Sequence, residues 1–369
     1  MKRLILLSLL ASFSLNAESI PETQCEDPKA DPAQKVPYKF YVPINNKAAK
    51  CGSVDLRDKL PPVRNQSETG WCYAFAAADL ISAHIGKDVS PIDTALRYQK
   101  TQETIAEHKK SVKVRGAKCE IPLADAYTGG EIHEAINMAI KSKGVCLEET
   151  VPASESFTEN IKALEEANRR QLQLPWDQDT DIESRCHVIN SLSSLFPQNS
   201  PSQMKKMLAI SKKLNWQVYD EMVQKACQGK RHKLSRKIKV GNIDVDSPET
   251  EKLKPQAQKI MDEYLSKGKP VGYSSYFFFD GKSMEKGEFL NTGDSHATTV
   301  IGRKWNEEKG ACEYLVRNSY GQDCSTYDWT DPVDPTRVLN KSPYKCEDGN
   351  LWIPENQLMS AMTGITWIK

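Results

Sequence analysis

Cys72 is the side chain of this sequence best placed for covalent chemistry. It opens an apolar, alanine-rich run that predicts a buried helix from about Cys72 to Ile85, stopping near Gly86, and Gln66 precedes it by six residues. A helix N-terminus stabilises the thiolate, which is the nucleophilic form of cysteine. The Gln66 amide adds a neutral hydrogen-bond donor close to that thiol. The segment therefore indicates acyl transfer through a cysteine.

A nucleophilic cysteine needs a base, and the base needs an orienting partner. Among the six histidines, His296 has the clearest context, because it opens a β-rich run. Asn318 ends another such run, Tyr314–Arg317, and its amide can accept a hydrogen bond from one imidazole nitrogen. Singly these signals are weak, since a secreted cysteine is more often half of a disulfide. The order Gln66, Cys72, His296, Asn318 makes the set specific.

These blocks resemble, in the same order, those of the papain/cathepsin family of cysteine peptidases. The matching segments are Val54–Arg57, Pro62–Phe75, Thr128–Gly130, Ser295–Ala297, Arg317–Gly321 and Gly349–Pro354. The resemblance covers roughly residues 53–150 and 260–369. It implies an α+β, papain-like two-lobe fold, with a helical lobe around a buried central helix, a β-barrel-like lobe, and a cleft between them.

The resemblance also implies a role for each residue of the candidate site. These are Cys72 as nucleophile, His296 as its proton partner, Asn318 as orienting group, Gln66 with the Cys72 N–H as oxyanion hole, Gly129 and Gly130 as ligands of the substrate backbone, Ala297 as pocket lining, and Tyr320 as the aromatic shield. The implied function is a secreted cysteine peptidase that hydrolyses peptide bonds through a thioester acyl-enzyme. Its substrate is then a protein or peptide.

The sequence departs from the family pattern beside the nucleophile. Thr69 and Tyr127 stand where the family usually has two paired cysteines. Trp71 occupies a position that is usually small, where it either narrows the cleft or packs outward. Tyr320 replaces a tryptophan that usually shields the His–Asn hydrogen bond, so we expect reduced activity.

The N-terminus predicts export. Met1–Ala17 has a basic start and a short apolar region, which is typical of a signal peptide and too short to span a bilayer. The protein is therefore expected to be secreted or periplasmic. Residues 18–52 are expected to form an arm or short pro-segment. The peptidase domain is expected over 53–369, as a helical lobe (53–153), a helical insertion (154–240) and a β-rich lobe (241–369).

Local patterns predict further elements. An apolar stripe predicts a helix from about Glu131 to Ser142, and β-rich runs cover Val271–Phe279, Ala297–Ile301, Tyr314–Arg317 and Leu351–Ile353. The basic residues from Lys230 to Lys239 lack interleaved aromatic residues, so we interpret them as a solvated face.

Charge and cysteine content exclude several classes of protein. The formal net charge of +1 gives no reason to expect a nucleic-acid partner. The ten cysteines include no C-x-x-C, which argues against zinc ribbons and thioredoxin-type sites. No metal, cofactor or membrane span is expected, and the oligomeric state stays open. If Cys72 is free, at most four disulfides can form among the rest, with connectivity open.

Two alternatives remain open. Trp71 and Tyr320 leave room for a catalytically weak or inactive binding protein on a peptidase fold, although the intact site residues argue against it. A cell-wall peptide amidase that uses cysteine and histidine is the other alternative, and the Asn318 block favours the peptidase over it.

Overall fold

The structure is a computed structural model of the 369-residue chain. It describes residues 50–67, 69–110, 129–142, 144–153, 200, 202, 215–276, 295–330 and 337–369. The predicted signal peptide, the arm up to residue 49, Tyr127, Thr128 and most of the predicted insertion lie outside the described residues. In chain order the elements are β1 (Val54–Asp55), the 3₁₀ turn η1 (Arg57–Lys59), α1 (Cys72–Ile85), α2 (Pro91–Lys110), α3 (Ile132–Lys141), α7 (Asn215–Ala226), β2 (Val240–Asp244), η2 (Glu251–Leu253), α8 (Lys254–Ser266), β3 (Val271–Tyr276), β4 (Ser295–Asn306), β5 (Ala311–Arg317), η4 (Cys324–Tyr327), β6 (Trp329–Thr330), β7 (Val338–Asn340), β8 (Lys345–Glu347), β9 (Asn350–Pro354), α9 (Glu355–Ala361) and β10 (Met362–Ile368).

Helix α1 is the centre of a helical core. Every residue from Cys72 to Ser82 is buried, as expected for a helix that is apolar on nearly all faces. The helix packs against α2 and α3 on one side and against β3 and β4 on the other. It ends at Gly86, whose left-handed φ of 65° closes the last turn. The predicted helix and its stop are confirmed.

The end of the predicted insertion joins the same core. Met222, Val223 and Ala226 of α7 are buried with α1, α2 and the apolar stripe of α3. A disulfide between Cys146 and Cys227 ties the segment after α3 to the end of α7. Helix α3 itself lies within the range that the sequence predicts for it.

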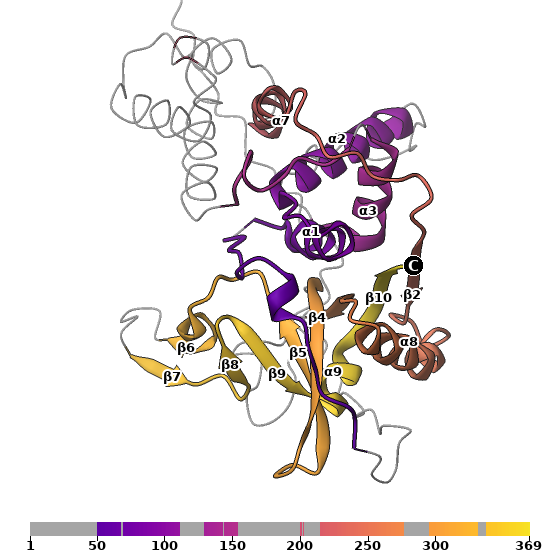
Figure 1. Ribbon diagram of the computed structural model, residues 1–369, viewed down its shortest axis with the longest axis vertical. Helices are drawn as coiled ribbons and strands as arrows, with labels where there is room; N and C mark the ends of the chain where they lie inside the picture. The colour runs from indigo at the N-terminus through magenta and orange to yellow at the C-terminus, as the bar shows by residue number, and fades with distance from the viewer. Residues whose placement is uncertain are drawn as a thin grey trace, which may run out of the picture.

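The second core lies on an antiparallel sheet. Its strand order is β2-β10-β3-β4-β5-β9-β8, with β1 paired to β4. Helices α8 and α9 pack on this sheet and bury Ala257, Met261 and Leu358 with its strands. Figure 1 shows the helices α1, α2 and α3 grouped at one end of β4, with α8 beside β10. The α+β fold with a helical lobe and a β lobe is confirmed, as are the predicted runs in β4, β5 and β9. The run predicted from Val271 is confirmed up to Tyr276, and its last three residues lie outside the described residues.

One expectation for the basic segment is wrong. Arg231 does not belong to a solvated face, because its guanidinium binds the fully buried Asp93 carboxylate through Nη1 and Nη2, at 2.8 and 2.9 Å. Asp93 also accepts hydrogen bonds from Arg97 and from the N–H of Cys146. A buried carboxylate needs such partners, so Arg231 serves the helical core. Lys233 and Lys237 are exposed, as predicted.

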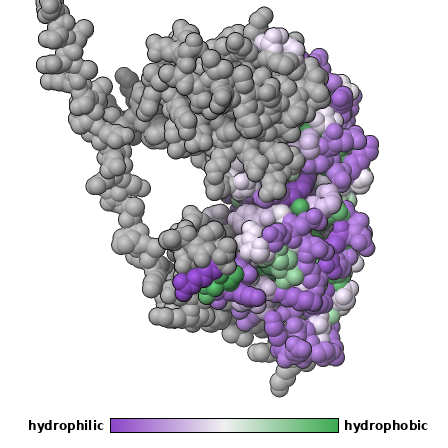
Figure 2. All heavy atoms as spheres, turned by 90° about the vertical axis from the view of Figure 1, so that its left-hand side faces the viewer, coloured by the Kyte–Doolittle hydropathy of each residue, from purple (hydrophilic) through white to green (hydrophobic). Residues whose placement is uncertain are grey.

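Disulfides join distant parts of the described chain. The pairs are Cys51–Cys312, Cys146–Cys227 and Cys324–Cys346, and Cys72 is the free cysteine among the residues described. Such bonds persist in oxidising compartments, which fits the expected export. Within the described ranges, no helix has the length and apolar character to cross a bilayer. The described residues on the face in Figure 2 are mainly hydrophilic, with small scattered hydrophobic groups.

Candidate active site

The Cys72 thiol lies at the N-terminus of α1 and is 8% exposed. The backbone groups of Ala297, Tyr73 and Cys72 itself act to lower the pKa of the thiol and thus favour the thiolate. Burial outweighs them and raises the pKa of the thiol above its ordinary value, and Glu131 adds to this effect. Trp71 is 1% exposed and lies in the helical core, so the indole packs inward, an arrangement that the sequence did not predict.

His296 and Asn318 are hydrogen-bonded to each other. Nε2 of His296 lies 2.7 Å from Oδ1 of Asn318, and both side chains are buried. A carbonyl oxygen only accepts, so Nε2 carries the proton in this arrangement. Nδ1 is then the nitrogen that can exchange a proton with a thiol. Ala297, which follows His296 on β4, is buried in the same hydrophobic cluster as Cys72, so the segment that carries the imidazole packs against the start of α1.

The register of two strands explains this pairing. Thr299 on β4 pairs with Arg317 on β5. His296 lies three residues before Thr299, and Asn318 follows Arg317 directly. The two therefore occupy diagonal positions at one end of the strand pair, where side chains share a face.

Burial also changes the proton affinity of the imidazole. It lowers the pKa of His296 to about 4, although the hydrogen bond to Asn318 acts in the opposite direction. Burial also raises the pKa of the Cys72 thiol, so both shifts favour the uncharged form of each group. The site without substrate is expected to hold a thiol and a neutral imidazole.

We expect acid to destabilise the protein through His296. The pKa falls from its ordinary 6.5 to about 4 on folding, so between these pH values the unfolded chain binds a proton that the folded chain does not. The free energy of unfolding should therefore fall as the pH falls, by about 3 kcal/mol at most from this group. Urea unfolding of the wild type and His296→Gln at pH 7 and pH 4 would measure it. Equal losses in both proteins would contradict this expectation.

Gln66 is held at both ends of its side chain. Its Oε1 accepts a hydrogen bond from the Ser319 hydroxyl, and its Nε2 donates to the Thr69 carbonyl at 2.6 Å. Thr69 also donates its hydroxyl to the Gln66 carbonyl at 2.7 Å. Thr69 thus fixes the loop by hydrogen bonds at the position where the resemblance implies a cysteine. These roles of Thr69 and Ser319 have no recognisable signal in the sequence.

Tyr320, which the resemblance implies as an aromatic shield, lies against the imidazole. Its ring centroid is 5.4 Å from that of His296 and 6.2 Å from that of Tyr327. The three rings form a continuous aromatic contact beside the His296–Asn318 hydrogen bond. This contact favours exclusion of water from that bond.

The two glycines before α3 differ in their surroundings. A Cβ on Gly130 would lie 2.6 Å from the Tyr98 ring and 3.0 Å from the Tyr73 ring, so only glycine fits. Gly129 is exposed, and a Cβ there would meet nothing within 4 Å. Gly130 therefore has a packing role, whatever it binds. The Tyr98 hydroxyl, which accepts from the N–H of Glu131, fixes the chain there.

One buried carboxylate joins three segments of the site. Asp79 accepts from Arg64 Nη2 at 2.6 Å and from Arg317 Nε at 2.8 Å. Asp79 lies two helical turns after Cys72 on α1, Arg64 precedes Gln66 by two residues, and Arg317 directly precedes Asn318. The signal that could have revealed this junction is a lone carboxylate within an apolar helix.

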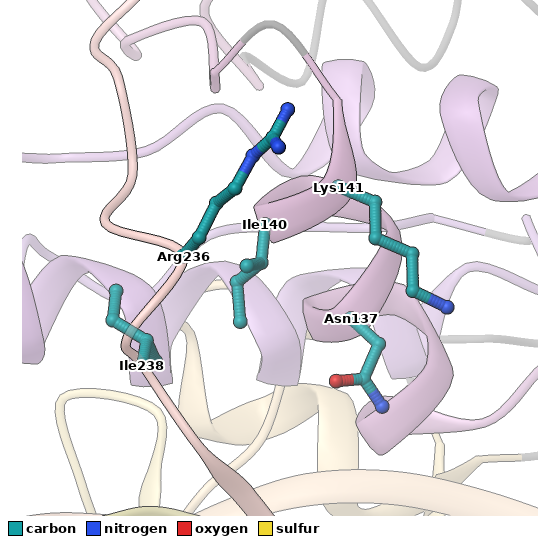
Figure 3. Close-up of a pocket in the computed structure, with 5 residues that line it drawn as sticks. All are labelled: Asn137, Ile140, Lys141, Arg236 and Ile238. Carbon is teal, nitrogen blue, oxygen red and sulfur yellow. The ribbon is translucent and has the colours of Figure 1, made fainter.

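A pocket of about 460 Å³ lies apart from these residues. It is lined by Asn137, Ile140 and Lys141 of α3 together with Arg236 and Ile238. In Figure 3 the Arg236 and Lys141 side chains extend away from each other, so they do not converge on one ligand. None of the candidate site residues lines this pocket.

Comparisons with known proteins give similarities only at the level of structure. No family model matches the chain, and no curated protein matches its sequence. It is similar to the Amb a 11 cysteine protease, a major ragweed pollen allergen, in its proform, at 13% identity and a TM-score of 0.39 over 88% of this chain and 68% of that one. It is similar to the bromelain protease from Ananas comosus in complex with the E64 inhibitor, at 14% identity and a TM-score of 0.38. This match covers 86% of this chain and 98% of that one. It is also similar to digestive procathepsin L 3 of Tenebrio molitor larval midgut, at 10% identity and a TM-score of 0.39. This match covers 91% of this chain and 76% of that one. These are likenesses at 10–14% identity, and no argument about activity follows from them.

Proposed function

We propose that this protein is a cysteine peptidase, exported from the cell, that hydrolyses peptide bonds with Cys72, His296 and Asn318. One observation carries the proposal. The hydrogen bond of 2.7 Å between His296 Nε2 and Asn318 Oδ1 lies beside Ala297, which is buried in the same hydrophobic cluster as Cys72 where β4 packs on α1. The proposed nucleophile therefore lies on an element that packs against the strand of the proposed base and its orienting group, which supports covalent acyl transfer.

The first half of the reaction forms a thioester. The thiol proton passes to Nδ1 of His296 as the sulfur bonds to the carbonyl carbon of the substrate. Because burial favours the neutral pair, His296 acts as a general base during this attack. The oxyanion that forms accepts hydrogen bonds from the Cys72 N–H and the Gln66 amide. His296 then gives its proton to the leaving amine as the carbon–nitrogen bond breaks.

The second half of the reaction releases the acid product. His296 removes a proton from water as the water oxygen bonds to the thioester carbon. The sulfur leaves and regains its proton from the imidazolium. Throughout both halves, Asn318 keeps Nε2 protonated and Nδ1 directed to the reacting atoms. Tyr320 protects the bond between His296 and Asn318 from water.

A second candidate is a binding protein with weak or no catalysis. The observation that favours it is the burial of both reacting groups, which raises the pKa of Cys72 and lowers the pKa of His296. Such a protein would bind peptides without turning them over. The reactivity of the thiol separates the two candidates, because a site that only binds peptides does not require an activated nucleophile.

An epoxysuccinyl inhibitor tests the proposal directly. The full chain should gain the mass of one inhibitor on the peptide that contains Cys72, and Cys72→Ser should gain none. His296→Gln should label far more slowly, because the thiol loses its base. Absence of labelling in the wild type from pH 4 to pH 8 would favour the binding protein. Release of muropeptides from purified cell wall, with no cleavage of proteins, would instead favour the amidase.

A further inference from the structure

Thr69 holds Gln66 at two separate points. Its hydroxyl donates to the Gln66 carbonyl at 2.7 Å, and its own carbonyl accepts from Gln66 Nε2 at 2.6 Å. The N–H of Thr69 also donates to the Gln66 carbonyl, at 3.3 Å. Both residues are buried, at 7% and 4% exposure, so these bonds form in a medium of low polarity, where hydrogen bonds are strong. One residue thus contacts both the backbone of Gln66 and its amide.

The Thr69 carbonyl determines which way the Gln66 amide is turned. The Ser319 hydroxyl donates to Oε1 of Gln66, while the Thr69 carbonyl accepts from Nε2. A hydroxyl can either donate or accept, so Ser319 alone would tolerate the amide in both orientations. A carbonyl can only accept, and it cannot bond the Oε1 that would face it if the amide turned over. The orientation of the amide therefore depends on where the Thr69 carbonyl lies.

The chain between Gln66 and Thr69 contains a strained residue. Ser67 has a φ of 53°, in the left-handed region that residues other than glycine rarely adopt. The Asn65 side chain supports it from one side, because its Oδ1 accepts from the N–H of Ser67 at 2.8 Å. The bonds from Thr69 to the Gln66 carbonyl hold the other side. A strained backbone persists where its surroundings hold it, so loss of the Thr69 hydroxyl should let this segment relax.

We propose that Thr69 is a positioning residue for the oxyanion hole. Its hydroxyl anchors the segment so that the Thr69 carbonyl binds one N–H of Gln66 Nε2 and leaves the second N–H for the oxyanion. The inference rests on the proposed function, and Thr69 acts through Gln66. Without the hydroxyl, the carbonyl would move away from Nε2 and the amide could turn over. Oε1 would then face the oxyanion, where an acceptor opposes the developing negative charge.

The variant Thr69→Val removes the hydroxyl and keeps the shape of the side chain. We expect kcat for a fluorogenic peptide to fall about 3- to 10-fold, which corresponds to the loss of one hydrogen bond. KM should change little, because the oxyanion exists only in the transition state. Alkylation of Cys72 by iodoacetamide forms no oxyanion, so its rate should stay close to that of the wild type. Thr69→Ser retains a hydroxyl and should restore kcat. An alkylation rate that falls as far as kcat, or no recovery with serine, would overturn the inference.

Thr94→Val is the matched control. Thr94 is also buried, and its hydroxyl and N–H both donate to the Ser90 carbonyl, at 3.0 and 3.3 Å. It lies on α2 and contacts none of the proposed site residues through these bonds. Both variants lose a hydroxyl bonded to a backbone carbonyl, so urea unfolding should show similar losses of stability. Only Thr69→Val should lower kcat. An equal fall of kcat in the two variants would contradict the inference.

A double substitution tests whether Thr69 acts through Gln66. In a Gln66→Ala background, Thr69→Val should leave kcat unchanged, whereas independent effects would multiply and contradict the inference. Failure of the proposed function is recognised separately, by a wild-type chain that an epoxysuccinyl inhibitor never labels. NMR needs no activity and still reports on Thr69. The side-chain amide signal that disappears in Gln66→Ala should exchange its protons with water faster in Thr69→Val than in the wild type, and equal exchange would overturn the inference.

Discussion

Replacing Asp79 by asparagine is expected to lower the free energy of unfolding by about 3–5 kcal/mol, the usual result of removing one member of a buried ion pair. Asp79 accepts from Arg64 at 2.6 Å and from Arg317 at 2.8 Å, and all three side chains are at most 8% exposed. Asparagine keeps the volume but leaves two buried guanidinium groups without this carboxylate. Glu148 still binds Arg64, at 3.1 Å, and Arg317 keeps the carbonyl of Pro62. The loss of stability should therefore come mainly from Arg317, which is left without a carboxylate partner.

An exposed ion pair of the same type provides the control for this loss. Asp55 binds Arg57 at 2.6 Å, and their side chains are 39% and 34% exposed. Asp55→Asn should cost about 1 kcal/mol or less, since solvent screens such a pair. Urea unfolding of both variants at pH 7 makes the comparison. A cost for Asp79→Asn that equals that of Asp55→Asn would show that the buried junction contributes little.

Replacing Gln66 by alanine is expected to lower kcat about 10²–10³-fold if the protein is a peptidase. The amide would be lost from the oxyanion, which exists only in the transition state, so KM should change little. In the structure, Nε2 of Gln66 donates to the Thr69 carbonyl at 2.6 Å, and its second N–H is the one that can turn to substrate. Hydrolysis of a fluorogenic peptide gives both constants.

Ser319→Ala is the control for Gln66→Ala. It removes the hydroxyl that binds Gln66 Oε1 but keeps the donor amide. Its kcat should fall far less than that of Gln66→Ala. A loss below about 10-fold for Gln66→Ala would exclude the amide from the oxyanion hole and leave the Cys72 N–H as the donor that we propose.

The parts of the fold that local sequence determines were predictable. The helix Cys72–Ile85 combines an apolar surface with a glycine stop, and both features are readable in a short window. Helix α2, over Pro91–Lys110, was not predicted, because its second half is polar and carries no apolar stripe. Strand β10 was not predicted either. Its pairing with β2 and β3 depends on partners that lie far away in sequence.

The candidate site was predictable as a set of residues but not as a supported arrangement. Cys72, His296 and Asn318 each stand in a recognisable local context, and their order carries the resemblance. The supports of the site are long-range contacts between ordinary residue types. The bond from Ser319 to Gln66 joins residues 253 positions apart, and no local pattern specifies it. The burial that shifts the pKa of His296 likewise depends on the completed fold.

The disulfide between Cys51 and Cys312 makes most of the chain a covalent ring. The two cysteines are 261 residues apart, and the ring contains Cys72 and His296 but not Asn318. A single backbone cut within it opens the ring without separating the fragments. Such a nicked molecule would migrate as one species until a reductant is added. Its two fragments would remain linked beside β5, the strand that leads to Asn318, so the three residues of the site could stay together after cleavage.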